Sequence, residues 1–265
     1  MDDRAPDQSF MDFLQHCWPD SSAEAKQHAL NYVTGFNAAD PAQVGVHWLV
    51  KEMRAEEKID GERAFRTRNG YSALLKIFDE RLAKLNVGVK LNTVVERVTW
   101  SPGDVCVEAM SEGHPILLRA RRLLLTVPLG VLQTPICERS AIEFRPPLPE
   151  EKLKAIAGLE MGKVVRIVLH FRARFWEQLR PDATRGKTLA DMSFLFSQDN
   201  WFPTWWTTMP DRLPLITGWA PFRCAERLMS EDVSVVDRSL QTLSGLLNVS
   251  LRKLEYLLEG SYLHD

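Results

Sequence analysis

Residues Pro146–Phe171, PPLPEEKLKAIAGLEMGKVVRIVLHF, place a linker, a helix and a strand in succession. Three prolines among the first four residues cannot continue a helix or a central strand, so they predict a linker. Pro149, followed by Glu150 and Glu151, predicts a helix start, because proline and acidic side chains suit the first helical turn. The helix is expected to end near Gly158.

The strand expected over residues 163–171 has two unlike faces. One face is continuously apolar and carries Val165, Ile167, Leu169 and Phe171. The other face carries Arg166 and His170 between valines. A period of two with one apolar face is typical of a half-buried strand. We therefore expect Arg166 and His170 to line a cavity or to face solvent.

The first 65 residues are expected to be helical. Ser21 and Glu24 have the spacing of a capping box at one helix start. Residues 44–59 predict a second helix, whose charged run KEMRAEEK forms a solvated face. Apolar side chains at steps of three and four predict a further amphipathic helix over 71–85.

Short strands are expected over 94–100, 105–109 and 116–118, joined by the turns SPGD and SEGHP. The run LLLTV at 123–127 is continuously apolar and predicts a strand buried on both faces. Near the end, Ser230 is a plausible cap for a helix that runs to about 247, and a last helix is expected over 251–258.

Composition excludes several classes of protein. The 265 residues are 45% hydrophobic and 26% charged with a net charge of −2, which argues against disorder and against nucleic-acid binding. The four scattered cysteines have no metal-binding spacing, so we expect reduced thiols, no metal and a cytoplasmic protein. No apolar run is long enough to cross a membrane. The motifs GxGxxG, GxxxxGK[ST] and GxSxG are absent.

The order of several motifs resembles the flavin-containing amine oxidases, the family of monoamine and polyamine oxidases. These motifs are GYSALL, VKLNTVVERVTW, LLLTVPLGVLQ and IEFRPPLPEEKLKAIAGLEMGKVVRIVLHFRARFW, and the resemblance extends from about Phe10 to Asp265. It implies an α+β (mixed α/β) fold, in which a partial FAD-binding domain is interleaved with a substrate domain made of a mixed sheet flanked by helices. Residues 1–65 would be the helical part of the substrate domain, 66–148 the partial FAD-binding domain, and 149–265 the substrate-domain sheet and helices.

The chain also departs from the family pattern. The strand–GxGxxG–helix unit that holds the cofactor pyrophosphate is absent, and so is the closing segment that covers the flavin ring. We therefore expect a middle piece of an amine oxidase, which holds FAD weakly or not at all by itself. An uncovered surface of the flavin-domain part would then favour self-association.

The resemblance implies three cofactor-binding positions. Val95 matches the strand whose backbone amide and carbonyl bind the adenine edge, and the alternative is an ordinary core valine. Thr126 and Pro128 match the passage from strand to turn beside the cofactor, and the alternative is a proline that ends a buried strand.

The resemblance implies a catalytic role for Arg166. This position matches the lysine that holds a water molecule against the reactive flavin nitrogen. Arginine is always charged, so it can hold water or stabilise negative charge, but it cannot act as a base at neutral pH. The alternative is a solvated arginine or a structural ion pair.

The stretch from Trp176 to Trp219 is rich in aromatic side chains that could line an amine pocket. The candidates for substrate contact are Phe194, Trp205 and Trp206, and the alternative is plain core packing. The function implied is FAD-dependent oxidation of an amine to an imine, with oxygen as acceptor and hydrogen peroxide as product. Two alternatives stay open, a non-catalytic interaction module without flavin and a related flavoprotein such as a desaturase or porphyrinogen oxidase.

Overall fold

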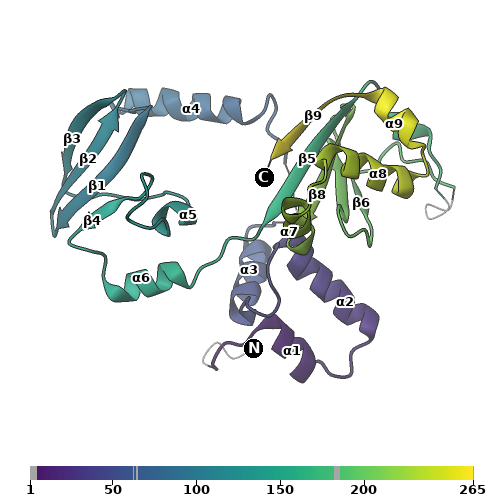
Figure 1. The fold of residues 1–265 in the computed structure, drawn as a ribbon, viewed down its shortest axis with the longest axis horizontal. Coiled ribbons are helices and arrows are strands. Elements are labelled where there is room, and N and C mark those ends of the chain that lie inside the picture. Colours follow the sequence, from purple (N-terminus) through teal and green to yellow (C-terminus); the bar gives the residue numbers. More distant parts are fainter. Residues whose placement is uncertain (1–4, 62, 64, 182–185, 265) are drawn as a thin grey trace. The chain divides into compact units, whose positions relative to one another are not determined.

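Residues 5–61, 63, 65–181 and 186–264 are described in a computed structural model (Figure 1). The chain divides into two compact units, and each is described by itself. The first unit consists of Met1–Ala55 and Gly162–Asp265, and the second of Glu56–Met161. Each unit combines helices with a sheet, which confirms the predicted α+β class. No helix in the described ranges is long and apolar enough to span a bilayer.

The first unit is built on a five-stranded antiparallel sheet. Its order is β6 (Phe194–Phe196), β7 (Thr204–Thr207), β8 (Leu215–Pro221), β5 (Val164–Phe171) and β9 (Leu258–His264). The predicted alternation of β5 is confirmed, because Val165, Ile167, Leu169 and Phe171 are at most 2% exposed. This face of the sheet is the core face of the unit.

Helices cover the core face. They are α7 (Arg223–Ser230), α8 (Val235–Leu247) and α9 (Leu251–Leu257), and the 3₁₀ helix η2 (Phe175–Gln178) precedes them in the chain. Leu228, Leu243 and Leu254, one from each α-helix, belong to the same buried cluster as β5. The apolar faces of α8 and α9, which the sequence periodicity predicted, therefore pack in the core of the first unit.

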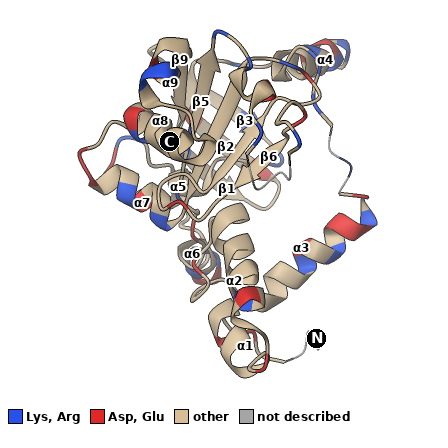
Figure 2. Cartoon of the chain, turned by 90° about the vertical axis from the view of Figure 1, so that its right-hand side faces the viewer, with Lys and Arg blue, Asp and Glu red and all other residues tan. Residues whose placement is uncertain are grey.

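The amino-terminal segment belongs to the first unit. It contains α1 (Phe10–His16), α2 (Ala23–Asn31), the π-helical turn η1 (Tyr32–Phe36) and α3 (Val46–Lys58). Figure 2 shows the expected charged surface on α3. Gly162, just before β5, lies against this segment, since a Cβ there would come within 2.5 Å of the Ala38 carbonyl oxygen.

Two predicted helix caps are wrong by a few residues. The cap of α2 is Ser22, whose Oγ accepts a hydrogen bond from the Ala25 amide at 3.1 Å, and not Ser21. The cap of α8 is Ser234, which accepts from the Asp237 amide at 3.2 Å. Ser230 is instead the last residue of α7. Where serines stand close together, sequence spacing does not decide which one adopts the extended cap conformation.

The second unit contains a four-stranded mixed sheet in the order β3 (His114–Ala120), β2 (Asp104–Ser111), β1 (Thr93–Ser101) and β4 (Glu143–Arg145). Neighbours are antiparallel except β1 and β4, which are parallel. The helices are α4 (Tyr71–Lys84), α5 (Leu129–Leu132) and α6 (Glu150–Ala157). The strands and helices predicted over 71–118 are confirmed, and so is the helix after Pro149.

The prediction of a strand over 123–127 is wrong. Leu123–Val127 is neither strand nor helix, and Leu124 is 85% exposed. A strand buried on both faces needs neighbouring strands and covering layers, and the described part of the second unit supplies neither to this run. The expectation that the run is less buried than its composition demands is confirmed.

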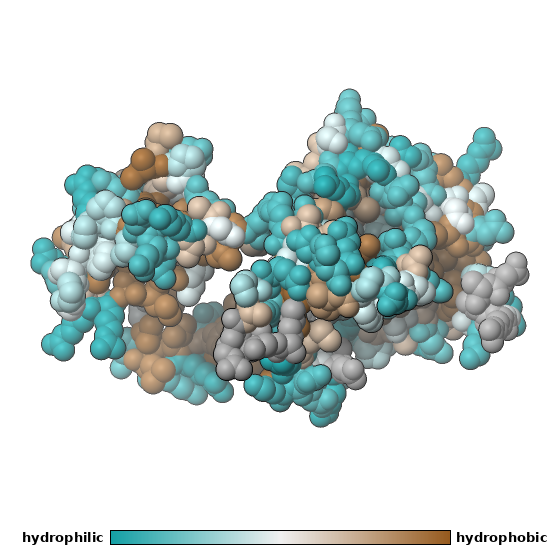
Figure 3. All heavy atoms as spheres, turned by 90° about the horizontal axis from the view of Figure 1, so that it is seen from below, coloured by the Kyte–Doolittle hydropathy of each residue, from teal (hydrophilic) through white to brown (hydrophobic). Residues whose placement is uncertain are grey.

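Helix α4 also exposes apolar side chains. None of its residues is buried, and Tyr71 is 77% and Leu75 60% exposed. The apolar positions of α4 are therefore left unburied by the described residues of this unit. Figure 3, which views the molecule from below, shows hydrophobic residues at another part of the surface of the second unit, on the left.

An ion-pair network joins three strands on the second sheet. Arg97 on β1 donates from Nε to Glu143 and from a terminal nitrogen to Glu108, both at 2.6 Å. Arg145 donates to the other Glu143 oxygen, also at 2.6 Å. Hydrogen bonds from Arg97 and then Arg145 hold the pKa of Glu143 below its ordinary value of 4.5.

Acid is expected to weaken this network. A lowered folded-state pKa means that Glu143 stabilises the fold above about pH 4.5 and loses this contribution as the pH falls through its folded-state value. The melting temperature followed from pH 7 to pH 3 should fall less steeply in Glu143→Gln than in the wild type. Glu138→Gln is the control, because Glu138 is exposed and has no ion pair in the described ranges. Identical pH profiles for all three proteins would contradict the assignment.

Candidate functional site

The face of the first sheet opposite the core, which we call the open face, carries several partly or largely exposed aromatic side chains. Directly paired residues of antiparallel strands share a face, so the register identifies the residues on it. Arg166 pairs with Trp219 of β8 on one side and with His264 of β9 on the other. Trp219 pairs with Thr204, and Thr217 pairs with Trp206 of β7. Trp206 and Thr204 pair in turn with Phe194 and Phe196 of β6.

Arg166 lies on this open face in β5, between β8 and the edge strand β9. Its side chain is partly buried, and its Nε is inaccessible and has no hydrogen-bond partner among the described residues. The ion-pair alternative considered for this residue finds no partner in the same ranges. A partly desolvated guanidinium without a counter-charge is costly. The position therefore suits a polar or anionic group of a bound molecule.

Four aromatic side chains form a continuous row on the open face, which we call the aromatic ladder. Ring centroids are 5.9 Å apart for Phe196 and Phe194, and 6.4 Å apart for Phe194 and Trp206. Trp206 and Trp219 follow at 6.0 Å. The ladder thus leads from the edge strand β6 to the neighbour of Arg166. Phe196 is 71% and Phe194 58% exposed, so these rings are available to a ligand.

The π-helical turn η1 is tied to the Trp219 end of the ladder. Trp219 Nε1 donates a hydrogen bond of 2.9 Å to the Gly35 carbonyl oxygen. Tyr32 and Phe36 stack at 5.4 Å within the turn and are both exposed. Isolated π-helical turns often mark functional sites. Neither the turn nor its link to Trp219 was foreseen, because a π turn has no reliable sequence pattern.

Trp205 does not share the site with Phe194 and Trp206. It is fully buried on the core face, where its Nε1 donates to the Phe202 carbonyl at 2.8 Å. Adjacent residues of a strand point to opposite faces, so Trp205 and Trp206 cannot both reach one ligand. In this structure Trp205 therefore presents no surface to a substrate, and its role is core packing.

The expected cofactor positions all lie in the second unit. Val95 is on β1 beside a bulge, where the register shifts between Val95 and Arg97. The bulge lets Val95 pack with Val98 on the core side of that sheet. Strand β4 pairs only with Arg97–Thr99, so the part of β1 that contains Val95 has an unpaired edge. Free backbone groups at such an edge can bind the rim of a planar base.

Thr126 and Pro128 lie in the exposed passage that leads into α5. Pro128 is the residue before that helix and has extended backbone angles. Both side chains are accessible, so the passage is free to contact a ligand. The Pro128 carbonyl oxygen accepts a hydrogen bond of 3.0 Å from the Val131 amide, and Thr126 has no hydrogen-bond partner within the described ranges.

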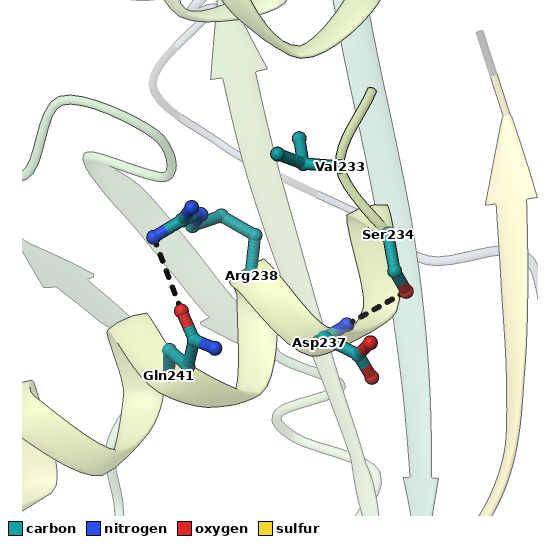
Figure 4. A pocket seen from close by; sticks show the side chains of 5 residues that line it. All are labelled: Val233, Ser234, Asp237, Arg238 and Gln241. Carbon is teal, nitrogen blue, oxygen red and sulfur yellow. Dashed lines mark hydrogen bonds between the residues drawn. The ribbon is translucent and has the colours of Figure 1, made fainter. Parts of the chain in front are cut away.

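Two surface hollows lie elsewhere in the first unit. One of about 630 Å³ is lined by Phe194 together with Arg180, Lys187 and Met192, and so adjoins the β6 end of the ladder. The other, of about 180 Å³, lies at the start of α8 (Figure 4). There Ser234 caps the helix, and Arg238 donates to Gln241 at 3.1 Å and lies over the Trp201 ring, while its Nε has no hydrogen-bond partner among the described residues. No metal-binding cluster occurs in the ranges that the structure describes.

Comparison with known proteins matches residues 8–257 to the family of flavin containing amine oxidoreductases. Mouse lysine-specific histone demethylase 1B is 37% identical over 109 residues, which are 41% of this chain and 12% of that protein. Polyamine oxidase 1 of Zea mays is 33% identical over 103 residues, which are 39% of this chain and 18% of that protein. The matched segments thus span less than a fifth of these relatives.

Solved structures show the same fold. Putrescine oxidase bound to putrescine superposes with a TM-score of 0.72 at 17% identity, covering 97% of this chain and 53% of that one. Cyclohexylamine oxidase from Brevibacterium oxydans gives 0.66 at 15% identity with the same coverage. The fold and the match over nearly the whole chain agree with the motif order, and the chain belongs to the flavin-containing amine oxidoreductase family.

Proposed function

We propose that the open face of the first sheet takes part in FAD-dependent oxidation of an amine to an imine, with oxygen as acceptor. The observation that carries the proposal is Arg166, a partly buried cation without a partner among the described residues, beside an exposed aromatic ladder. Family membership supports flavin chemistry in general terms. The substrate and the oxygen step are inferences from these observations.

Some residues of this chain are suited to bind parts of FAD. Arg166 would hold a water molecule or negative charge at the reactive edge of the flavin through its guanidinium, which has no ion-pair partner among the described residues. The unpaired edge of β1 at Val95 would bind the adenine, and Thr126 and Pro128 would border the cofactor. When bound, FAD supplies the oxidation and passes the electrons to oxygen, which yields hydrogen peroxide.

The chain's own residues then position the amine. The rings of Phe194 and Trp206 offer an apolar surface for its carbon skeleton, and they exclude water from the reacting carbon. Arg166 stays protonated at neutral pH, so it orients and stabilises charge but does not remove a proton. An amine must therefore reach the site in its neutral form or lose its proton to water.

The second candidate function is that of a non-catalytic interaction module. It would need no desolvated cation, whereas Arg166 is held without a partner on an otherwise aromatic face. Catalytic sites tolerate such a cost, which is why we favour the oxidase.

Amine-dependent hydrogen peroxide tests the proposal. Purified chain with FAD in large excess and a panel of primary and secondary amines should release peroxide, and catalase should abolish the signal. Heat-denatured chain with the same FAD is the control for free-flavin chemistry. Peroxide no higher than in this control for every amine would favour the non-catalytic module.

A further inference from the structure

We infer that the open face selects an arylalkyl monoamine and discriminates against diamines and polyamines. The inference deepens the proposed function, because it names the substrate class of the same face. It rests on the distribution of charge and of aromatic rings over that face.

Apart from Glu259 at the bulge of β9, the register places no carboxylate on the open face of the five strands. The residues on it are Val164, Arg166, Val168, His170, Phe194, Phe196, Thr204, Trp206, Leu215, Thr217, Trp219, Pro221, Gly260, Tyr262 and His264. The permanent charge in this set is the positive charge of Arg166. A second ammonium group would therefore be desolvated without a counter-ion and would face a guanidinium.

Three carboxylates come near the margins of this face, and each has a partner. Glu52 of α3 accepts a hydrogen bond of 3.0 Å from Asn37, just beyond η1. Glu259 lies 3.7 Å from His170 Nδ1, on the side of β5 away from the ladder, and His170 is four residues, or about 13 Å along the strand, from Arg166. Asp191 lines the hollow that Phe194 also lines, and it accepts a hydrogen bond of 2.6 Å from Arg212.

The aromatic ladder offers a surface on which an aryl group can pack. Its rings are tilted or stacked at 5.9 to 6.4 Å, a spacing at which aromatic pairs attract. A ligand ring lying on Phe194 and Trp206 would extend this packing. The same ring faces attract an ammonium only weakly at an exposed site, so they do not replace a carboxylate.

Tryptophan emission tests the inference without flavin or turnover. The full chain is titrated with 2-phenylethylamine and, separately, with putrescine. Half-saturation by 2-phenylethylamine is expected at a concentration at least tenfold lower than for putrescine. Trp206→Phe should reduce the amplitude of the emission change, which assigns the change to the ladder. Because this readout needs no oxidation, its result is independent of the peroxide assay.

A charge placed on the face should reverse the preference. Thr204 pairs with Trp219 and Phe196, so Thr204→Glu sets a carboxylate on the ladder. The preference should shift at least tenfold toward putrescine in Thr204→Glu and stay unchanged in the neutral control Thr204→Gln. The inference would be overturned if the wild type bound putrescine as tightly as 2-phenylethylamine. Loss of that tight putrescine binding in Glu52→Gln or Glu259→Gln would identify the carboxylate that binds the second ammonium group. Emission that saturates with neither amine would overturn it too.

Discussion

Replacing Gly218 with alanine is expected to destabilise the first unit by about 3 kcal/mol, at the upper end of the cost of overpacking a core. Gly218 is on β8, and a Cβ there would lie 2.7 Å from Trp205 Cζ3 and 3.1 Å from Phe202 Cδ1. Both side chains are fully buried, and Trp205 is held by its hydrogen bond to the Phe202 carbonyl. The ring therefore cannot move aside without breaking the core. Urea unfolding followed by tryptophan emission measures the effect.

Gly245→Ala is the matched control. Gly245 is in α8, and a Cβ there meets nothing within 4 Å. Alanine in place of a helical glycine should stabilise the unit by about 1 kcal/mol. If Gly218→Ala were as stable as the wild type, the packing of Trp205 against β8 described here would be wrong.

FAD is expected to bind this chain with a dissociation constant well above one micromolar. The 265 residues contain no GxGxxG motif, and therefore no glycine-rich turn that would place pyrophosphate at a helix N-terminus. Charge-assisted hydrogen bonds contribute roughly 1.5–3 kcal/mol each, so the lack of several phosphate contacts lowers affinity by orders of magnitude. The remaining contacts would be those at Val95, Thr126, Pro128 and Arg166. Flavin fluorescence quenching during titration measures the affinity.

Riboflavin is the matched ligand for this experiment, because it has the flavin ring but neither phosphate nor adenine. Without a phosphate cradle, FAD and riboflavin should differ in affinity by about tenfold, since only the adenine contact at Val95 separates them. Sub-micromolar FAD binding with much weaker riboflavin binding would show that the chain does hold the pyrophosphate, and the prediction would fail.

Strand β5 could be predicted from the sequence because its period of two is strong and its apolar face is uninterrupted. The aromatic composition of the stretch put Trp205 and Trp206 together as pocket residues, although neighbouring residues on a strand point to opposite faces. Only the register shows that Trp206, and not Trp205, shares a face with Arg166. The ladder is therefore a tertiary feature, made by three strands whose order the sequence does not reveal.

The prediction of a strand over Leu123–Val127 was wrong because it relied on local composition alone. The composition of this run is that of a buried strand, but a strand is defined by its neighbours, and local propensity cannot supply them. The π-helical turn η1 was missed because its link to Trp219 joins residues 184 positions apart. The catalytic role of Arg166 was inferred from family resemblance, and its lack of a partner among the described residues emerged only from the structure.

Anaerobic reduction of FAD by an amine, in the wild type and in Arg166 variants, tests the account most directly. With FAD well above its dissociation constant, 2-phenylethylamine should bleach the flavin absorbance of the wild type. Arg166→Met should slow this about 100-fold, as for loss of one charge-stabilising donor, while 2-phenylethylamine should still saturate the change in tryptophan emission. Arg166→Lys should retain most of the rate. Reduction by Arg166→Met as fast as by the wild type would contradict the assignment of the open face as the amine-oxidising site.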